Sequence, residues 1–185
     1  FALILLKVSL LATILTHPII PLTIGLIASR TVLPWRLVLV AMLCSIIPDL
    51  DVISFKLGVA YESNFGHRGF SHSLIFAAAL ASVLCLFSKQ LQSERLNVWL
   101  FCFIGAASHG VLDAFTNGGL GVAFYWPFEN ARYFFSQRVI EVSPIGVSRF
   151  LSERGMAVLQ SEFRWVWLPC TFLVASFHTA KSVWK

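Results

Sequence analysis

NVWLFCFIGAASHGVLD, residues 97–113, is an apolar run with a histidine and an aspartate at its far end. His109 and Asp113 lie four positions apart, so on a helix their side chains share one face about one turn apart. The run approaches the roughly 20 residues that an α-helix needs to cross the hydrocarbon core of a bilayer. The stretch therefore predicts a membrane helix that carries an imidazole and a carboxylate at one end.

The composition of the whole chain agrees with a membrane location. Of the 185 residues, 57% are hydrophobic and only 12% are charged, and the mean hydropathy is +0.78. A soluble domain has roughly 25% charged residues. The sequence therefore predicts a single integral membrane domain over residues 1–185, rather than a soluble globular protein.

The charges and the cysteines argue against two other kinds of function. The net charge is +5, but no run of Lys and Arg reaches the length of a nucleic-acid-binding patch, so no nucleic-acid partner is expected. All four cysteines lie inside apolar runs and none belongs to a C-x-x-C pair. Neither a disulfide framework nor a thiolate metal site is therefore favoured.

Six apolar segments organise the chain. They are residues 1–15, 17–29, 33–48, 73–88, 97–113 and 163–180. The first segment resembles the core of a signal peptide, but no A-x-A cleavage site follows it, so we expect a retained helix. Because Pro18 and Pro21 lie at the join, the first two segments could also form one kinked helix.

A long polar segment, 114–162, separates the last two apolar segments. It contains the aromatic cluster FYWPF at 124–128, which is typical of membrane interfaces. Residues 143–163 predict an amphipathic helix that begins with Ser143 as its cap and Pro144 as its first residue. The predicted fold is therefore all-α, a polytopic membrane helical bundle with a long extracytoplasmic loop.

If each apolar segment crosses the membrane once, most of the metal-binding residue types reach the same face. These residues are Asp49, Asp51, His67, His72, His109 and Asp113, and His17 joins them if the chain turns at residues 16–18. The fifth histidine, His178, lies at the opposite end of segment 163–180. We expect His178 to be an interfacial bystander.

The two membrane faces differ in charge. The face without the cluster has six basic residues and one acidic residue; the basic residues are Arg30, Arg36, Lys89, Arg95, Lys181 and Lys185. The other face has seven basic and eight acidic residues. By the positive-inside rule the first face is cytoplasmic. The histidine and aspartate cluster is then expected to face the periplasm from a bacterial inner membrane.

The clustering of donors is a stronger signal than any single pair. A His–Asp pair at i and i+4, or the two carboxylates of PDLD at 48–51, also occurs without a metal. Here all three aspartates and four of five histidines converge, and ionisable residues near membrane spans are costly and usually functional. Seven nitrogen and oxygen donors are enough for two ions that share carboxylates. This donor set suits Zn²⁺, with Mn²⁺ or Fe as alternatives.

Several motifs resemble those of the YdjM-type family of predicted membrane-bound metal-dependent hydrolases. They are TH at 16–17, PDLD at 48–51, HRGFSHS at 67–73, SHGVLDAFTNGG at 108–119 and WPF at 126–128. The resemblance covers most of residues 16–170, and Ser71 stands where that family often has threonine. The order of the ligands is more loosely similar to zinc-dependent phospholipase C and P1-type nucleases. That similarity implies a phosphoesterase with a metal cluster on a helical scaffold.

The leading hypothesis is therefore an enzyme, a metal-dependent hydrolase at the membrane surface. It would cleave a phosphoester of a phospholipid or a polyprenyl phosphate with a metal-activated water. Either Asp49 or Asp51 would act as general base or orient a histidine. Arg68 and Arg132 would clamp the phosphate, although a surface charge facing lipid headgroups is the simpler interpretation of Arg132. Glu162 is either a reserve ligand or a helix cap.

Three alternatives belong to other classes of protein. One is a metal-ion transporter, which would need ligands near the middle of the membrane and a route to both sides. Another is a membrane protein that binds a metal without catalysis. The third is a membrane scaffold without chemistry, which predicts no bound metal. The sequence leaves open the lipid, the bond cleaved, the bound ion and the oligomeric state.

Overall fold

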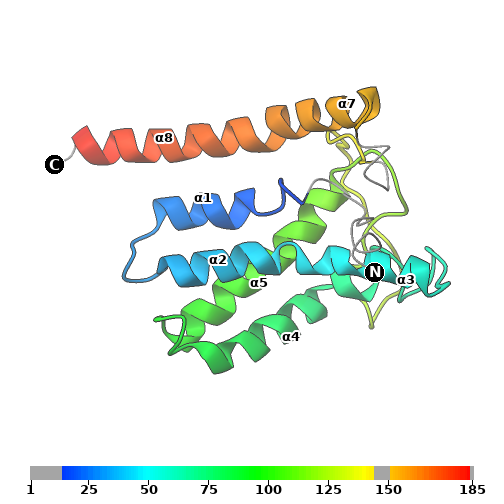
Figure 1. Cartoon of the computed structure of the whole chain (residues 1–185), viewed down its shortest axis with the longest axis horizontal. Coiled ribbons are helices and arrows are strands. Elements are labelled where there is room, and N and C mark those ends of the chain that lie inside the picture. The colour runs from blue at the N-terminus through cyan, green and yellow to red at the C-terminus, as the bar shows by residue number, and fades with distance from the viewer. Residues whose placement is uncertain (1–13, 144–150, 184–185) are drawn as a thin grey trace, which may run out of the picture.

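The computed structural model describes residues 14–143 and 151–183, and within these ranges every regular element is helical. The longer helices are α1 (Ile19–Ile27), α2 (Trp35–Cys44), α4 (Leu74–Leu84), α5 (Arg95–Ala114) and α8 (Leu168–Val183). They pack side by side along the long axis of the molecule, with α5 crossing obliquely (Figure 1). The prediction of an all-α fold is confirmed.

Shorter helical turns connect these helices. They are η1 (Ile47–Val52), α3 (Ile53–Lys56), η2 (Phe70–His72), η3 (Cys85–Phe87), α7 (Glu153–Glu162) and η4 (Phe163–Trp167). Ser73 caps α4, because its hydroxyl accepts a hydrogen bond from the backbone N–H of Phe76 at 3.1 Å. The polar segment after α5 contains two isolated β-bridges, Thr116 with Ile140 and Val122 with Tyr133.

The amphipathic helix and the last apolar segment join into one continuous helix. α7, the π-helical turn η4 and α8 follow one another without a break along one edge of the molecule (Figure 1). The described helix begins at Glu153. Its predicted start at Pro144 lies outside the described residues, as does nearly all of the first apolar segment, 1–15.

Helix α5 packs closely against α2 and α4. Small buried residues line these contacts: Ala41, Ala77, Ala81, Gly105 and Ala106. A Cβ on Gly105 would lie only 2.5 Å from the carbonyl oxygen of Ala41. Small side chains let helix backbones approach closely, which is how helices associate in membranes. The bundle therefore depends on the absence of a side chain at Gly105.

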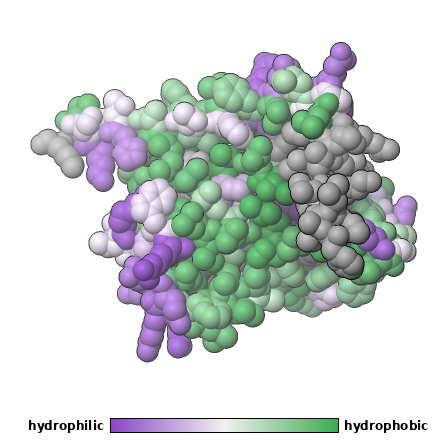
Figure 2. Space-filling model, in the orientation of Figure 1, coloured by the Kyte–Doolittle hydropathy of each residue, from purple (hydrophilic) through white to green (hydrophobic). Residues whose placement is uncertain are grey.

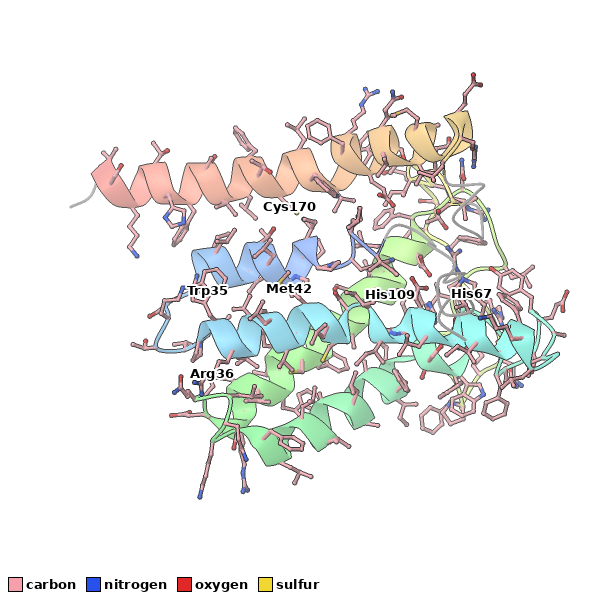
Figure 3. All side chains as sticks on the ribbon, viewed as in Figure 1. Trp35, Arg36, Met42, His67, His109 and Cys170 are labelled. Carbon is pink, nitrogen blue, oxygen red and sulfur yellow. The ribbon has the colours of Figure 1, made fainter. Side chains whose placement is uncertain are left out.

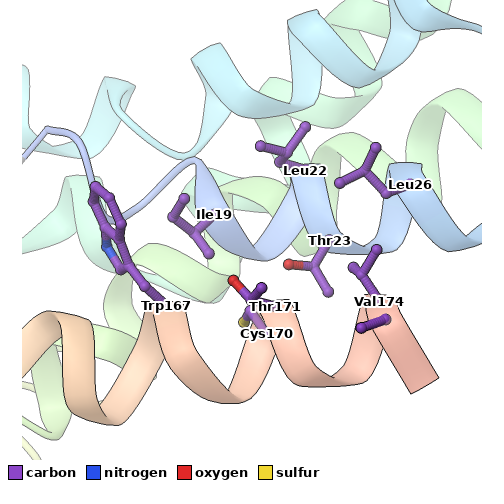
Figure 4. A pocket seen from close by; sticks show the side chains of 9 residues that line it. Ile19, Leu22, Thr23, Leu26, Trp167, Cys170, Thr171 and Val174 are labelled. Carbon is purple, nitrogen blue, oxygen red and sulfur yellow. The ribbon is translucent and has the colours of Figure 1, made fainter. Parts of the chain in front are cut away.

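The contact between α1 and α8 is looser. An apolar groove of about 270 Å³ lies between them (Figure 4), lined mainly by Ile19, Leu22, Leu26, Trp167, Cys170 and Val174. The outer face of α8 is largely uncovered, with Phe172 exposed over 72% of its surface. One side of α8 thus packs on the bundle while the other faces outward.

The two ends of the bundle carry different side chains. Arg30, Arg36, Lys89 and Arg95 are exposed in the turns between α1 and α2 and between α4 and α5, where Figure 2 shows the hydrophilic surface at one end. A wide hydrophobic surface follows it (Figure 2). Two stretches, Trp35–Lys56 and Arg95–Ala114, are long and apolar enough to cross a membrane. The predicted histidine and aspartate residues lie toward the opposite end, where Figure 3 labels His67 and His109.

Candidate metal centre

Four separate parts of the chain bring the predicted ligands together. They are the turn before α1 with His17, η1 with Asp49 and Asp51, the loop and turn before α4 with His67 and His72, and the end of α5 with His109 and Asp113. The side chains of all seven are buried, with at most 7% of their surface exposed. The predicted turn at residues 16–18 therefore places His17 with the others.

Four donor atoms form the centre of this cluster, which we call the inner set. They are Asp49 Oδ1, His72 Nε2, His109 Nε2 and Asp113 Oδ2, all within 4.8 Å of one another. The two imidazole nitrogens are 3.0 Å apart. Asp49 Oδ1 lies 3.3 Å from His109 Nε2, and Asp113 Oδ2 lies 3.3 Å from His72 Nε2. Two nitrogens and two oxygens thus face one point.

The far sides of the two rings fix which nitrogen carries the proton. His109 Nδ1 lies 2.7 Å from the carbonyl oxygen of Ser45, which can only accept, so Nδ1 is the N–H. His72 Nδ1 lies 3.0 Å from the Ser71 hydroxyl and 3.2 Å from an oxygen of Asp51. In their neutral forms both rings therefore point an Nε2 lone pair into the inner set. This arrangement of acceptors could hold a metal ion between them.

The carboxylates of Asp51 and Asp113 also affect the protonation of His72. Burial alone lowers the pKa of His72, but its hydrogen bonds with Asp113 and Asp51 outweigh burial and raise the pKa to about 9. His72 lies outside the two stretches that could cross a membrane. The carboxylates around this ring thus attract positive charge, whether as a proton or as a metal ion.

Asp51 orients histidines rather than facing the inner set. Its Oδ1 lies 2.7 Å from His67 Nδ1, and its Oδ2 accepts hydrogen bonds from the Ser71 hydroxyl at 2.6 Å and the Arg68 backbone N–H at 3.1 Å. Because threonine has the same hydroxyl, Ser71 keeps this contact despite departing from the family pattern. Carboxylates that hold the outer nitrogen of a ligand histidine are typical of metal sites.

His17 lies beside the inner set. Its ring stacks on that of His109, with the centroids 3.7 Å apart and an angle of 18° between the planes. Among the described residues neither nitrogen of His17 has a hydrogen-bond partner, and neither does Asp49 Oδ2. Buried polar atoms are nearly always paired. These unpaired atoms next to four converging donors fit a centre that holds a ligand not made of protein atoms.

The two predicted phosphate-binding arginines are both engaged by the protein. Arg68 is 2% exposed, and its Nε lies 3.0 Å from Asp113 Oδ2. Arg132 donates to the carbonyl oxygens of His67 and Ser63, each at 2.8 Å. Arg132 therefore fastens the loop that carries His67, and its suggested contact with phosphate stays a prediction.

Glu162 and His178 lie apart from the inner set. Glu162 Oε2 accepts a hydrogen bond from the Thr16 hydroxyl at 2.7 Å, and Trp167 Nε1 donates to the same hydroxyl at 2.8 Å. Glu162 thus ties the turn that carries His17 to the α7–α8 helix. His178 is exposed on α8, beside Phe177.

Two partners of the histidines were not among the predicted site residues. The carbonyl oxygen of Ser45 fixes the ring of His109, and the hydroxyl of Ser71 contacts both His72 and Asp51. A backbone carbonyl leaves no signal in the residue types. Ser71 lies inside the HRGFSHS motif, but its direction depends on the turn η2, which the spacing alone does not reveal.

The fold and the cluster define a class of protein: an all-helical membrane protein with a buried group of histidine and aspartate side chains that could hold a metal ion. Comparison of the sequence with known families identifies the family within this class. The profile of the YdjM inner membrane protein family matches residues 12–184, so the chain belongs to this family and is a membrane protein.

Individual relatives agree with the family. The chain is 42% identical over 164 residues to the inner membrane protein YbcI of Escherichia coli (strain K12), which covers 88% of this chain and 94% of that protein. It is 32% identical over 87 residues to the uncharacterized protein YvsG of Bacillus subtilis (strain 168), covering 43% of this chain and 51% of that protein. No solved structure gives a significant match.

Proposed function

We propose that the protein is a metal-dependent hydrolase at the membrane surface, and that it cleaves a phosphoester of a membrane lipid. The observation that carries the proposal is the inner set, in which two imidazole nitrogens and two carboxylate oxygens converge within 4.8 Å in a membrane protein. Nitrogen and oxygen donors without thiolate suit Zn²⁺, with Mn²⁺ or Fe as alternatives.

The proposed roles follow from the contacts. Asp49, His72, His109 and Asp113 hold the ion, while Asp51 orients the ring of His72. A bound Zn²⁺ would supply an acidified water and polarise a phosphoryl oxygen. The unpaired Asp49 Oδ2 is a candidate to accept a proton, since among the described residues it has no hydrogen-bond partner, and the nitrogens of His17 are unpaired in the same way.

A lipid is proposed as the substrate because of the surroundings of the site. Ala114, which follows Asp113, and Leu74, two residues after His72, line an apolar pocket of about 340 Å³. The other lining residues include Phe124, Tyr125, Tyr133 and Phe135. This pocket includes part of the aromatic cluster at 124–128. An aromatic and aliphatic lining suits an acyl or prenyl chain better than a polar metabolite. The proposed substrates are therefore phospholipids or polyprenyl phosphates.

The position of the cluster favours an enzyme over a metal-ion transporter. A transporter binds its ion near the middle of its helices. Here Asp49 follows the end of α2, and His109 and Asp113 lie in the last two turns of α5. Figure 3 shows His109 away from the end of the bundle that carries Arg36. A site at one end suits a reaction at the surface of the membrane. Transport remains the alternative, and it predicts zinc movement into proteoliposomes.

The basic turns at the other end support a multi-pass arrangement with the metal centre facing the periplasm. Arg30, Arg36, Lys89 and Arg95 are exposed together at that end. The positive-inside rule then makes this end cytoplasmic. A reporter fused after the last residue should be active in the cytoplasm, because α8 ends on the side of the basic turns (Figure 1). A periplasmic signal would reverse the proposed orientation.

The test of the proposed activity is hydrolysis by the purified protein in detergent micelles. Phospholipids and polyprenyl phosphates are assayed for release of phosphate or phosphorylated headgroup, before and after chelation and after zinc is restored. We expect activity that is lost with chelator and recovered with zinc. His109→Ala should be inactive, whereas His178→Ala, the same change on exposed α8, should remain active. Equal turnover by the two variants would contradict the proposal.

A further inference from the structure

The two groups of candidate ligands around His72 are not equivalent. The inner set is one, and Asp51, His67 and His72 form the other. In the second group both oxygens of Asp51 already accept hydrogen bonds, one near His67 and the other from Ser71 and the Arg68 backbone. His72 directs only its Nδ1 to this group, and that nitrogen carries the proton. The second group therefore offers no open oxygen to another ion.

Arg68 places a positive charge against the inner set. Its Nε lies 3.0 Å from Asp113 Oδ2, and its Nη1 donates to the carbonyl oxygen of Gly118 at 2.9 Å. A Cβ on Gly119 would lie 2.8 Å from Nη1, so the backbone closes tightly around the guanidinium. The side chain is 2% exposed and is held from several sides. It is built into the centre and does not reach outward for a substrate.

The formal charges of the buried groups around the inner set favour a single divalent ion. Three carboxylates, Asp49, Asp51 and Asp113, and the guanidinium of Arg68 have a formal charge of −2 when the histidines are neutral. One divalent ion cancels this charge, whereas two would leave an excess of positive charge in a buried site. Uncompensated buried charge is strongly unfavourable.

We infer that the cluster binds one divalent cation per chain at the inner set, and that the guanidinium of Arg68 takes the place of a second cation beside Asp113. Asp51 and His67 are then positioning residues rather than ligands. The inference rests on the proposed metal centre and makes it mononuclear, in contrast to the two ions expected from the number of donors in the sequence.

The first measurement is the zinc content of the full chain, purified in detergent, stripped with chelator, reloaded with zinc alone and washed. We expect about one equivalent per chain. Two equivalents would overturn the inference and leave the proposed hydrolase intact. No bound zinc would overturn the proposed metal dependence as well, so the two failures are distinguishable.

Variants test the roles of the second group. His67→Ala and Asp51→Asn should still bind about one equivalent, with Kd raised about 10–100-fold as for other residues that orient ligands. Asp49→Asn should lose the ion, and His178→Ala should equal the wild type. Helix content and a single elution peak establish that each variant is folded. A folded His67→Ala protein that holds one equivalent fewer than the wild type would overturn the inference. If no variant folds, the zinc content of the wild type decides.

Discussion

The buried cluster and the α1–α8 groove are two contacts between helices that depend on different physical requirements. In the cluster several side chains are held by a specific polar partner, such as the Ser45 carbonyl for His109 or Asp51 for His67. In the groove, Leu22, Leu26 and Val174 meet through apolar surfaces. Apolar contacts are roughly interchangeable when the surroundings are also apolar. Substitutions should therefore have sharply different effects in the two regions.

The largest expected effect comes from removing two ligands of the inner set. The double variant His72→Ala/Asp113→Ala lacks one nitrogen and one oxygen of the four converging donors. We expect zinc binding to fall by more than about 100-fold, because each removed ligand costs more than the loss of a residue that merely orients a ligand. Isothermal titration with zinc measures the change.

The control for this loss is a matched change in the other region. Cys170 lies in the groove and is a metal-binding residue type, but it has no partner in the inner set. The Cys170→Ala variant should bind zinc as the wild type does. If Cys170→Ala lowers the affinity as much as the double variant, the separation of the two regions is wrong.

The next largest effect should come from disturbing the close approach of α2 and α5. This contact lies on the same helix as His109 and Asp113. Gly105→Leu would force a side chain against the Ala41 carbonyl oxygen. Overpacking of this kind costs about 1–3 kcal/mol and occasionally more. We expect a lower midpoint of thermal unfolding in detergent, together with weaker zinc binding because His109 and Asp113 lie on the same helix.

Ile104→Leu is the control for this prediction, since Ile104 neighbours Gly105 but is 40% exposed. It should change the unfolding temperature little. An unchanged midpoint for Gly105→Leu would show that the two helices can separate without loss of the fold.

The sequence predicts the positions of the apolar helices well and the inner set only in part. Apolar runs such as 33–48 and 97–113 correspond to α2 and α5, because membrane helices are specified by hydropathy along short stretches. Counting crossings also placed Asp49 and Asp113 at the same end, and a turn at residues 16–18 was needed to add His17. The join of α7 to α8 was not predicted, since Glu162 and Arg164 suggest a boundary, whereas the helix continues through the π-helical turn η4.

The division of labour within the cluster could not be obtained from residue types. Asp49 and Asp51 are two residues apart in PDLD, yet only Asp49 faces the inner set. The difference arises because η1 directs the two side chains to different neighbours, and Arg68, with a φ of 63°, turns its backbone N–H toward Asp51. Spacing identifies the candidates, while the turns determine which of them converge.

The smallest effect is expected on the outer face of α8. Phe172 is 72% exposed there, on a helix that packs on α1 by its other side. Phe172→Ala should change the free energy of unfolding in detergent by no more than about 0.5 kcal/mol, as for most exposed positions. Leu37→Ala, at a fully buried position of the α2–α5 core, should cost about 2–5 kcal/mol. Thermal unfolding of both variants, with zinc content measured in parallel, compares them directly. If Phe172→Ala destabilises the protein as much as Leu37→Ala does, then the outer face of α8 is covered in the micelle by something more specific than detergent. The loose contact of α8 with the bundle would then describe only the chain without that covering.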